Sequence, residues 1–251
     1  MKNNMGYVIA LAGKGGTGKT TIAALLVRLL RENKKSSILA IDADPNSNLN
    51  EALGVEIKDT VGEILDKVSA HPESVTAGMS KEKFIEYQLR TALAEGNGFD
   101  LLAMGKPEGP GCYCYVNNVL RNIVNKLLTE YNYIIIDNEA GLEHLSRRTT
   151  RSCDSLLIVS DDTVVGLKSA ERILALADNL KIKIGKRYLL LNRIRNQLKE
   201  FPEINGVNFC GVIPWDEEII KLSSEGSSVE SLNMNSISIE ALRKMGDKIW
   251  Q

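Results

Sequence analysis

The chain has 251 residues, of which 43% are hydrophobic and 25% are charged. This composition is typical of a globular protein and excludes a disordered tail, a collagen and a small disulfide-stapled scaffold. The 31 Lys and Arg residues nearly balance the 32 Asp and Glu residues, so we expect no nucleic-acid partner. The apolar runs are far shorter than the roughly 20 residues of a membrane-spanning helix, and no targeting segment is visible. We therefore expect a cytoplasmic protein with no membrane partner.

Short apolar runs alternate with longer segments of helical periodicity along the chain. Strands are predicted at residues 7–12, 37–41, 99–104, 133–136, 155–160, 188–191 and 207–213. Helices are predicted at residues 19–32, 81–94, 117–129, 167–180 and 239–249. This alternation predicts an α/β fold with a doubly wound, mostly parallel sheet flanked by helices, which binds ligands at the carboxyl ends of its strands. We expect one domain over residues 1–251, decorated by a helical, polar insertion around residues 59–98.

A phosphate-binding pattern follows the first predicted strand. Residues 13–20 read Gly-Lys-Gly-Gly-Thr-Gly-Lys-Thr, which satisfies G-x-x-x-x-G-K-[ST]. Such a loop curls its backbone N–H groups around phosphates, Lys19 reaches the outer phosphates, and the Thr20 hydroxyl binds Mg²⁺. A glycine-rich turn without function would leave both lysines of the loop unexplained. The predicted nucleotide-binding residues of this P-loop are Gly13, Gly15, Gly16, Thr17, Gly18, Lys19, Thr20 and Thr21.

Carboxylates follow two of the predicted strands. Asp42 and Asp44 lie in the run Ile-Asp-Ala-Asp-Pro, for which a plain Asp-Pro turn is the alternative interpretation. Asp137 closes the apolar run Tyr-Ile-Ile-Ile-Asp, a placement typical of a carboxylate that holds Mg²⁺ through water. Residues 137–141 continue as a candidate switch segment, in which Gly141 would allow close approach to the γ-phosphate.

Lys14 adds a second lysine inside the P-loop. With it the loop resembles the deviant Walker A signature of the MinD-type ATPases, a class that includes ParA, the arsenical pump ATPases and the nitrogenase iron protein. The resemblance implies Mg²⁺-dependent hydrolysis of ATP to ADP and phosphate, in a homodimer that closes on ATP with Lys14 reaching the partner's phosphates. It also implies that Asp44 orients the attacking water and that Asp42 supports Mg²⁺. Lys14, Lys19 and Asp44 are therefore the predicted catalytic residues.

The choice of base is predicted from the end of a later strand. Guanine-specific P-loop proteins usually carry N-K-x-D there, whereas this chain reads Asn-Arg-Ile-Arg at residues 192–195. An arginine in the place of the aspartate disfavours GTP. By the resemblance, Asn192 and the loop at Pro214 enclose adenine. Arg193 is assigned to the same base site, with a solvated surface residue as the alternative.

Cys112 and Cys114 form a C-x-C pair in a predicted loop. Adjacent thiolates favour soft or borderline metals such as Zn²⁺, Ni²⁺, Cu⁺ or an iron–sulfur cluster. Two ligands make half a site, which a homodimer would complete by supplying the pair twice. Two small buried hydrophobes, or a strained redox disulfide, are the alternatives. Cys153 and Cys210 are predicted to be core residues.

A narrower resemblance is carried by the C-x-C pair together with the run Asp-Asn-Glu-Ala-Gly-Leu-Glu-His-Leu-Ser-Arg at residues 137–147. With Lys14 and the Asp44-Pro45 pair, these features look like the CooC-type ATPases, which insert nickel into carbon monoxide dehydrogenase. The resemblance implies that Cys112 and Cys114 bind Ni²⁺ between two subunits, with Zn²⁺ possible at the same thiolates, and that carbon monoxide dehydrogenase or a related nickel enzyme is the client. The alternatives are a MinD- or ParA-like positioning ATPase on membrane or DNA, and an iron–sulfur carrier ATPase.

Overall fold

The strands of the sheet are built from the apolar runs of the sequence. The computed structural model describes residues 6–32, 36–44, 48–70, 79–105, 122–139, 142, 152–198 and 200–250. Its strands are β1 (Tyr7–Ala12), β2 (Ile38–Asp42), β3 (Ala94–Gly96), β4 (Phe99–Ala103), β5 (Tyr133–Asp137), β6 (Ser152–Ser160), β7 (Lys183–Ile194) and β8 (Asn208–Pro214). They form one sheet in the order β3-β4-β2-β5-β1-β6-β7-β8, in which only the β3–β4 pair is antiparallel. The predicted mostly parallel α/β fold is confirmed.

The helices follow the apolar periodicity and mostly begin at side chains that cap them. They are α1 (Lys19–Arg31), α2 (Leu49–Leu53), α3 (Val61–Ala70), α4 (Lys81–Thr91), α7 (Val164–Asn179), α8 (Glu217–Ser224), the 3₁₀ helix η2 (Val229–Ser231) and α9 (Ile237–Ile249), and residues 122–128 are also helical. Ser80, Thr163, Asp216 and Ser236 each accept a backbone N–H of the helix they precede, as N-cap residues do. None of the described helices is long and apolar enough to cross a membrane.

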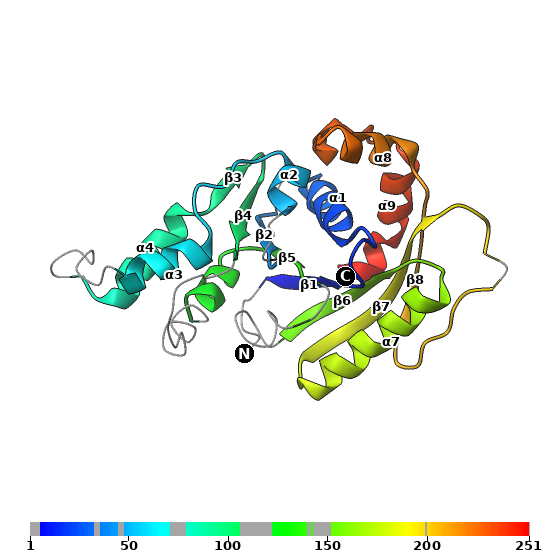
Figure 1. The fold of residues 1–251 in the computed structure, drawn as a ribbon, viewed down its shortest axis with the longest axis horizontal. Helices are drawn as coiled ribbons and strands as arrows, with labels where there is room; N and C mark the ends of the chain where they lie inside the picture. The colour runs from blue at the N-terminus through cyan, green and yellow to red at the C-terminus, as the bar shows by residue number, and fades with distance from the viewer. Residues whose placement is uncertain are drawn as a thin grey trace.

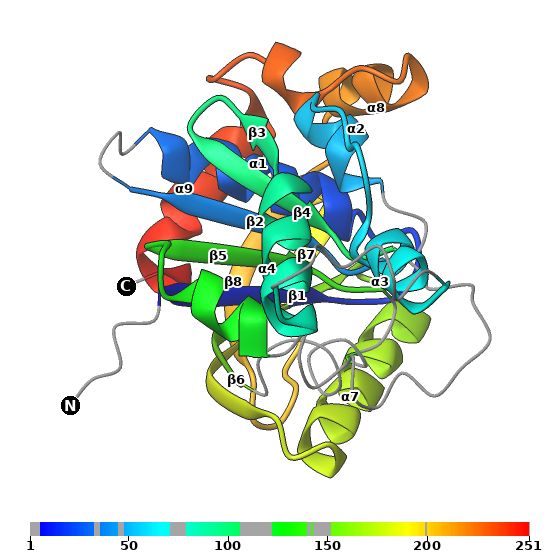
Figure 2. The same cartoon turned by 90° about the vertical axis from the view of Figure 1, so that its left-hand side faces the viewer.

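Helices cover both faces of the sheet. Side chains alternate between the faces along a strand, so Val8 and Ala10 of β1 belong to one apolar cluster while Ile9 and Leu11 belong to the other. The first cluster includes side chains of α3, α4, α7 and residues 122–128, and the second includes side chains of α1, α2 and α9. Figures 1 and 2 show α1 and α9 on one side of the sheet and α7 on the other. Burial on both faces explains why the central strands are uniformly apolar.

Several predictions about local structure need correction, among them the strand predicted at 155–160, which as β6 begins at Ser152. The predicted helix at 81–94 ends at Thr91, and residues 94–96 instead form β3. β3 pairs with β4 through the two-residue turn Asn97-Gly98, a hairpin signal that the sequence prediction overlooked. β7 begins at Lys183 rather than at residue 188, and α7 begins at Val164 rather than at residue 167. These ends are polar or exposed, so hydrophobic periodicity does not report them.

Candidate functional site

The P-loop connects β1 to α1 at the carboxyl edge of the sheet. Gly18 precedes α1 in the left-handed conformation (φ 88°, ψ 24°), and a Cβ there would lie 2.5 Å from the Asn192 side-chain nitrogen. Only glycine fits this position without strain or collision. At Gly15 and Gly16 an added Cβ would meet nothing within 4 Å in the described part of the chain. The outer side of the loop is therefore open to a ligand.

Lys19 lies inside the P-loop although it carries a charge. Its side chain is 8% exposed, and its Nζ donates a hydrogen bond of 3.4 Å to the Lys14 carbonyl, which also accepts from the Thr17 hydroxyl at 2.9 Å. Burial lowers the pKa of Lys19, while the negative charges of Asp137, Asp44 and Glu139 act in the opposite direction. Lys14 itself is exposed.

Asp42 and Asp137 are neighbours across two adjacent parallel strands. They face each other in the β2–β5 register, so the carboxyl ends of both strands bring them to the same edge of the sheet. The oxygens of Asp42 accept hydrogen bonds from the backbone N–H groups of Asp44 (3.1 Å) and Leu49 (2.9 Å). Asp42 is fully buried, and burial raises its pKa to about 6. This carboxyl group thereby fixes the backbone at both ends of the segment between β2 and α2.

Asp137 has the features of a cation ligand. It is 1% exposed, its side chain shares a hydrogen bond with Thr20, and its Oδ1 has no hydrogen-bond partner among the described residues. Burial, reinforced by the charge of Asp42, raises the pKa of Asp137 to about 7. A buried, unpartnered carboxylate oxygen beside a hydroxyl is a donor set suited to Mg²⁺, which prefers oxygen ligands. Thr20 and Asp137 therefore fit the magnesium ion that a P-loop requires.

The residues predicted to hold the base lie together. Asn192, Arg193 and Pro214 line one pocket with Thr21 of the P-loop. A neighbouring cavity of about 280 Å³ also includes Thr21 but none of these three residues, so the larger free space at the phosphate loop lies beside the predicted base residues rather than between them. Sequence reasoning missed further side chains that line the first pocket, because they come from α8 and α9, far along the chain. These are Ile219, Ile220 and Ser238.

Asp216 lines this pocket and connects the two helices, α8 and α9, that contribute to it. It is 7% exposed, and its carboxylate accepts the N–H of Glu218 at 3.0 Å and that of Ser238 at 3.3 Å. One side chain thereby caps α8 and ties it to the start of α9. The sequence indicates only the cap, as Asp-Glu-Glu before an apolar pair.

The cysteines divide into two groups. Cys153 and Cys210 are buried in the two apolar clusters, which confirms them as core residues, and burial raises their pKa to about 12 and about 11. Cys112 and Cys114 lie outside the described residues, as does Gly141 of the candidate switch. Within the ranges that the structure describes, no group of three or more His, Cys, Asp or Glu side chains is arranged to hold a metal ion.

The family assignment agrees with this geometry. A family model described as the CobQ/CobB/MinD/ParA nucleotide binding domain matches residues 8–229. The chain belongs to the MinD/ParA family. It is therefore a nucleotide-binding P-loop ATPase, as Lys14 and the rest of the loop predict.

Relatives of this MinD/ParA-family chain span nearly its full length. It is 39% identical over 248 residues to an uncharacterized ATP-binding protein of Methanocaldococcus jannaschii, covering 96% of this chain and 98% of that one. It is 30% identical over 251 residues to the carbon monoxide dehydrogenase accessory protein CooC of Rhodospirillum rubrum, covering 90% of each. It is also 30% identical over 246 residues to the septum site-determining protein MinD of Thermotoga maritima, covering 92% of this chain and 83% of that one.

A solved structure shares the fold. The septum site-determining protein MinD of Pyrococcus horikoshii, complexed with Mg-ADP, superimposes with a TM-score of 0.68 at 22% identity, covering 98% of this chain and 96% of that one. The CooC and MinD relatives are equally similar in sequence, so the comparisons establish the family and its ATPase core but not the cargo or the partner.

Proposed function

We propose that this MinD/ParA-family ATPase closes as a homodimer on ATP and Mg²⁺, binds Ni²⁺ through the Cys112–Cys114 pairs of both subunits, and delivers it to a nickel enzyme such as carbon monoxide dehydrogenase. The ATPase core is supported by the buried, unpartnered Asp137 oxygen beside Thr20. The nickel part is supported by the CooC relative and by the C-x-C pair of the sequence.

Each residue of the carboxyl edge has a separate task in this proposal. Lys19 compensates the charge of the outer phosphates, because it is held inside the loop at the point where that charge enters. Thr20 and Asp137 hold the magnesium ion, which neutralises phosphate charge when bound. Asp44 orients the attacking water, and Asp42 supports it by accepting its backbone N–H. The exposed Lys14 contributes charge to the phosphates of the partner subunit.

Nickel is the cargo of this proposed cycle rather than a resident cofactor. Two thiolates per subunit give four sulfur ligands in a dimer, which suits a tetrahedral or square-planar ion. Zn²⁺ accepts the same thiolates, so selection between the two ions depends on geometry and supply. If ATP and metal both favour the closed dimer, each tightens the binding of the other by the same factor.

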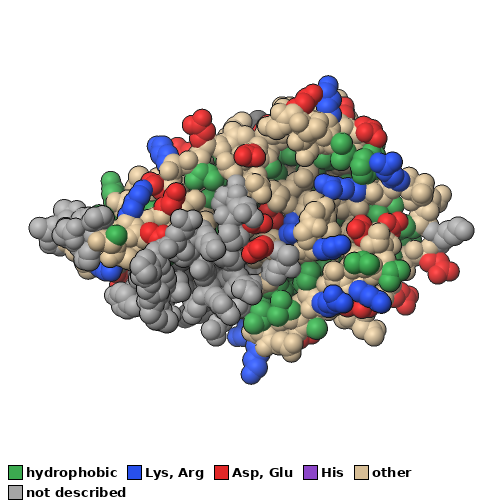
Figure 3. Space-filling model, viewed as in Figure 1, with side chains coloured by type: hydrophobic (Ala, Val, Ile, Leu, Met, Phe, Trp, Pro, Cys, Tyr) green, Lys and Arg blue, Asp and Glu red, His purple; other side chains and the backbone are tan. Residues whose placement is uncertain are grey.

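A positioning role on a membrane is the second candidate, because the MinD relative is as similar as CooC. Membrane attachment through an amphipathic helix needs a free apolar face. In α9 that face is used in the fold, since Ile239, Leu242 and Ile249 are 0% exposed. Among the described residues on the face shown in Figure 3, positive and negative side chains are intermixed, whereas DNA or an anionic lipid surface would favour a patch of positive charge.

The deciding experiment measures Ni²⁺ binding and oligomeric state together. Full-length protein is titrated with Ni²⁺ by equilibrium dialysis in the presence of ADP or of a non-hydrolysable ATP analogue, and its mass is followed by light scattering. We expect one Ni²⁺ per dimer, bound at least about tenfold more tightly with the ATP analogue. Cys112→Ala/Cys114→Ala should abolish both Ni²⁺ binding and Ni²⁺-dependent dimerisation.

The matched control removes the two core thiols instead. Cys153→Ala/Cys210→Ala loses the same number of sulfurs but should keep Ni²⁺ binding. Full-strength Ni²⁺ binding by a monomer lacking Cys112 and Cys114 would refute the nickel proposal. Co-sedimentation with anionic liposomes or DNA only in the presence of ATP would favour the positioning role. A visible absorption spectrum of an iron–sulfur cluster after anaerobic purification would favour the carrier role.

A further inference from the structure

A β-bulge at the end of β7 changes where its side chains point. Leu191 is opposite Val212 and Ile194 is opposite Pro214, so Asn192 and Arg193 together face a single residue of β8. Arg193 has a φ of 61°, in the left-handed region that side chains other than glycine rarely adopt. Bulges of this kind occur where a strand must redirect a side chain. A non-glycine residue held in this conformation indicates that its side chain has a role.

Both bulge residues bind the P-loop backbone. Asn192 Nδ2 donates to the Thr17 carbonyl at 2.8 Å, and Arg193 Nη1 donates to the Gly16 carbonyl at 3.0 Å. In a regular strand, consecutive side chains point to opposite faces, so only one of them would reach the loop. The bulge therefore allows two neighbouring side chains to hold two consecutive carbonyl groups.

Holding these carbonyls orients the groups that bind phosphate. In a planar trans peptide the C=O and the N–H of the next residue point in opposite directions. The bond from Asn192 therefore turns the N–H group of Gly18 away from β7. The N–H group of Thr17, in the peptide whose carbonyl Arg193 holds, donates to the Lys14 carbonyl at 3.4 Å and closes the turn of the loop. A P-loop binds phosphate with its backbone N–H groups, so these bonds hold the curled loop before a nucleotide arrives.

We propose that Arg193 is a positioning residue that latches the P-loop in its phosphate-binding conformation. Arg193 acts through the Gly16 carbonyl, so it should strengthen the binding of any polyphosphate chain, whether or not the ligand carries a base. This differs from the base contact that the sequence predicts for Arg193. The proposal rests on nucleotide binding by the P-loop and is independent of the nickel cargo.

Arg195 provides a matched control two residues along the chain. Its guanidinium carbon lies 3.9 Å from the centre of the Trp215 ring, a cation–π contact that involves no P-loop atom. Both arginines are exposed and each has one described interaction through its guanidinium. Removing either one changes the net charge equally, so a difference in phosphate affinity between the two variants does not come from net charge.

The test compares Mg·ATP with inorganic tripolyphosphate, which has the phosphates but no base. Affinities of the full-length protein for both ligands are measured by calorimetry. Arg193→Ala should weaken both affinities by roughly three- to tenfold, the usual effect of losing one partly exposed charged hydrogen bond. Arg193→Lys should restore part of the loss, and Arg195→Ala should leave tripolyphosphate binding unchanged.

Each other outcome has a defined meaning. Weaker binding of Mg·ATP alone would make Arg193 a base contact and overturn the latch, and unchanged affinities for both ligands would overturn it as well. If wild-type protein bound neither ligand, nucleotide binding itself would fail, which is a different result from failure of the latch.

A second pair of variants separates positioning from folding. Lys181, at the end of α7, also has a positive φ (53°) and is exposed. Arg193→Gly and Lys181→Gly should each relieve backbone strain and leave the melting temperature no lower than that of wild type. Only Arg193→Gly should weaken tripolyphosphate binding. A clear fall in melting temperature for Arg193→Gly, matched by the loss of affinity, would show that Arg193 serves the fold and would overturn the proposal.

Discussion

The sheet has an amino edge, where its parallel strands begin, and a carboxyl edge, where they end. Buried polar side chains are arranged differently at these two edges. At the amino edge these groups bind one another: Tyr7 shares a 2.8 Å hydrogen bond with Ser155, whose hydroxyl lies 2.8 Å from the Ile249 carbonyl. At the carboxyl edge, Oδ1 of Asp137 and Oδ1 of Asn138 are both buried without a partner among the described residues. Folding thus supplies partners for the Tyr7 and Ser155 hydroxyls, whereas the two buried oxygens of Asp137 and Asn138 have none within the described part of the chain and are open to a ligand.

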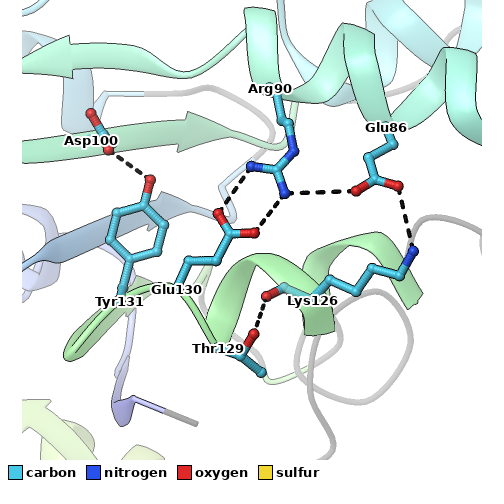
Figure 4. Close-up of polar contacts among 7 residues, drawn as sticks. All are labelled: Glu86, Arg90, Asp100, Lys126, Thr129, Glu130 and Tyr131. Carbon is cyan, nitrogen blue, oxygen red and sulfur yellow. Dashed lines mark hydrogen bonds and ion pairs between the residues drawn. The ribbon is translucent and has the colours of Figure 1, made fainter. Parts of the chain in front are cut away.

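Near the amino edge, polar and charged side chains of α4, β4 and the segment before β5 form a network at the surface, which Figure 4 shows. Tyr131 donates to Asp100 at 2.6 Å, and the guanidinium of Arg90 binds both oxygens of Glu130 at 2.9 and 2.6 Å. Glu86 lies 3.6 Å from Arg90 and also pairs with a lysine of the helix at residues 122–128. Arg90, Lys126, Glu86 and Glu130 each face an opposite charge, and Asp100 accepts from the Tyr131 hydroxyl, so the polar groups drawn there are paired with one another.

At the carboxyl edge, by contrast, two buried carboxyl groups have raised pKa values. Burial raises the pKa of Asp42 to about 6 and that of Asp137 to about 7. Carboxyl groups with shifted pKa values are common at functional sites, because such sites bury charged groups that interact with a ligand. Three substitutions test this contrast, from the largest expected effect to the smallest.

Asp137→Asn should have the largest effect, with opposite signs on activity and stability. Loss of the magnesium ligand should lower ATP hydrolysis roughly 100-fold or more. The pKa of Asp137 is about 7 in the folded protein, whereas an unfolded aspartate has a pKa of about 4. Between these two values the folded wild type holds a proton on Asp137 that the unfolded chain has lost. Its free energy of unfolding therefore falls as the pH rises through this range. The asparagine side chain of the variant cannot ionise, so at pH 8 the metal-free variant should be more stable, by roughly 2–4 kcal/mol.

Denaturant unfolding at several pH values checks this prediction. The slope contributed by Asp137 should disappear from the pH 6–7 window, while the slope due to Asp42 remains at lower pH. Equal stability losses at every pH would mean that Asp137 is a satisfied structural residue like those of the amino edge.

Ser155→Ala should show the reverse pattern at the amino edge. Ser155 is 0% exposed, and its removal leaves the Tyr7 hydroxyl and the Ile249 carbonyl without their partner. The expected cost is about 1–3 kcal/mol of unfolding free energy, with kcat/KM for ATP unchanged. The double variant Tyr7→Phe/Ser155→Ala should cost less than the sum of the two single variants, because both partners are then absent. A loss of activity in the stable double variant would contradict the division between the edges.

Arg90→Ala should have the smallest effect. Arg90 and Glu130 are both more than one third exposed, so water and salt screen their attraction. We expect a loss below about 1 kcal/mol, which shrinks further at high salt and leaves ATP hydrolysis unchanged. Thermal melts at low and high salt measure it, and Glu86→Gln serves as a milder control on the same network. A loss of several kcal/mol would show that α4 depends on this network rather than on its apolar face.

Much of the candidate site could be predicted from local sequence. The P-loop requires glycine where its backbone is left-handed, so Gly16 and Gly18 mark the loop wherever it is placed in the fold. Asp42 and Asp137 are recognisable because each ends an apolar run. The short strand β3 was missed because three residues, one of them glycine, carry too little periodicity, although Asn97-Gly98 signals the hairpin.

By itself the sequence determined most of the longer strands and helices and the loop that matches a phosphate-binding pattern, since these follow from patterns only a few residues long, but it did not show the short elements β3, α2 and α8. The strand order was decided by the tertiary structure, because pairing between distant segments depends on how both faces of the sheet are buried together. That order sets Asp42 beside Asp137 across 95 residues of chain and gives both carboxyl groups their raised pKa values. It also brings the bulge of β7 against the P-loop, where a strained arginine meets a carbonyl 177 residues away.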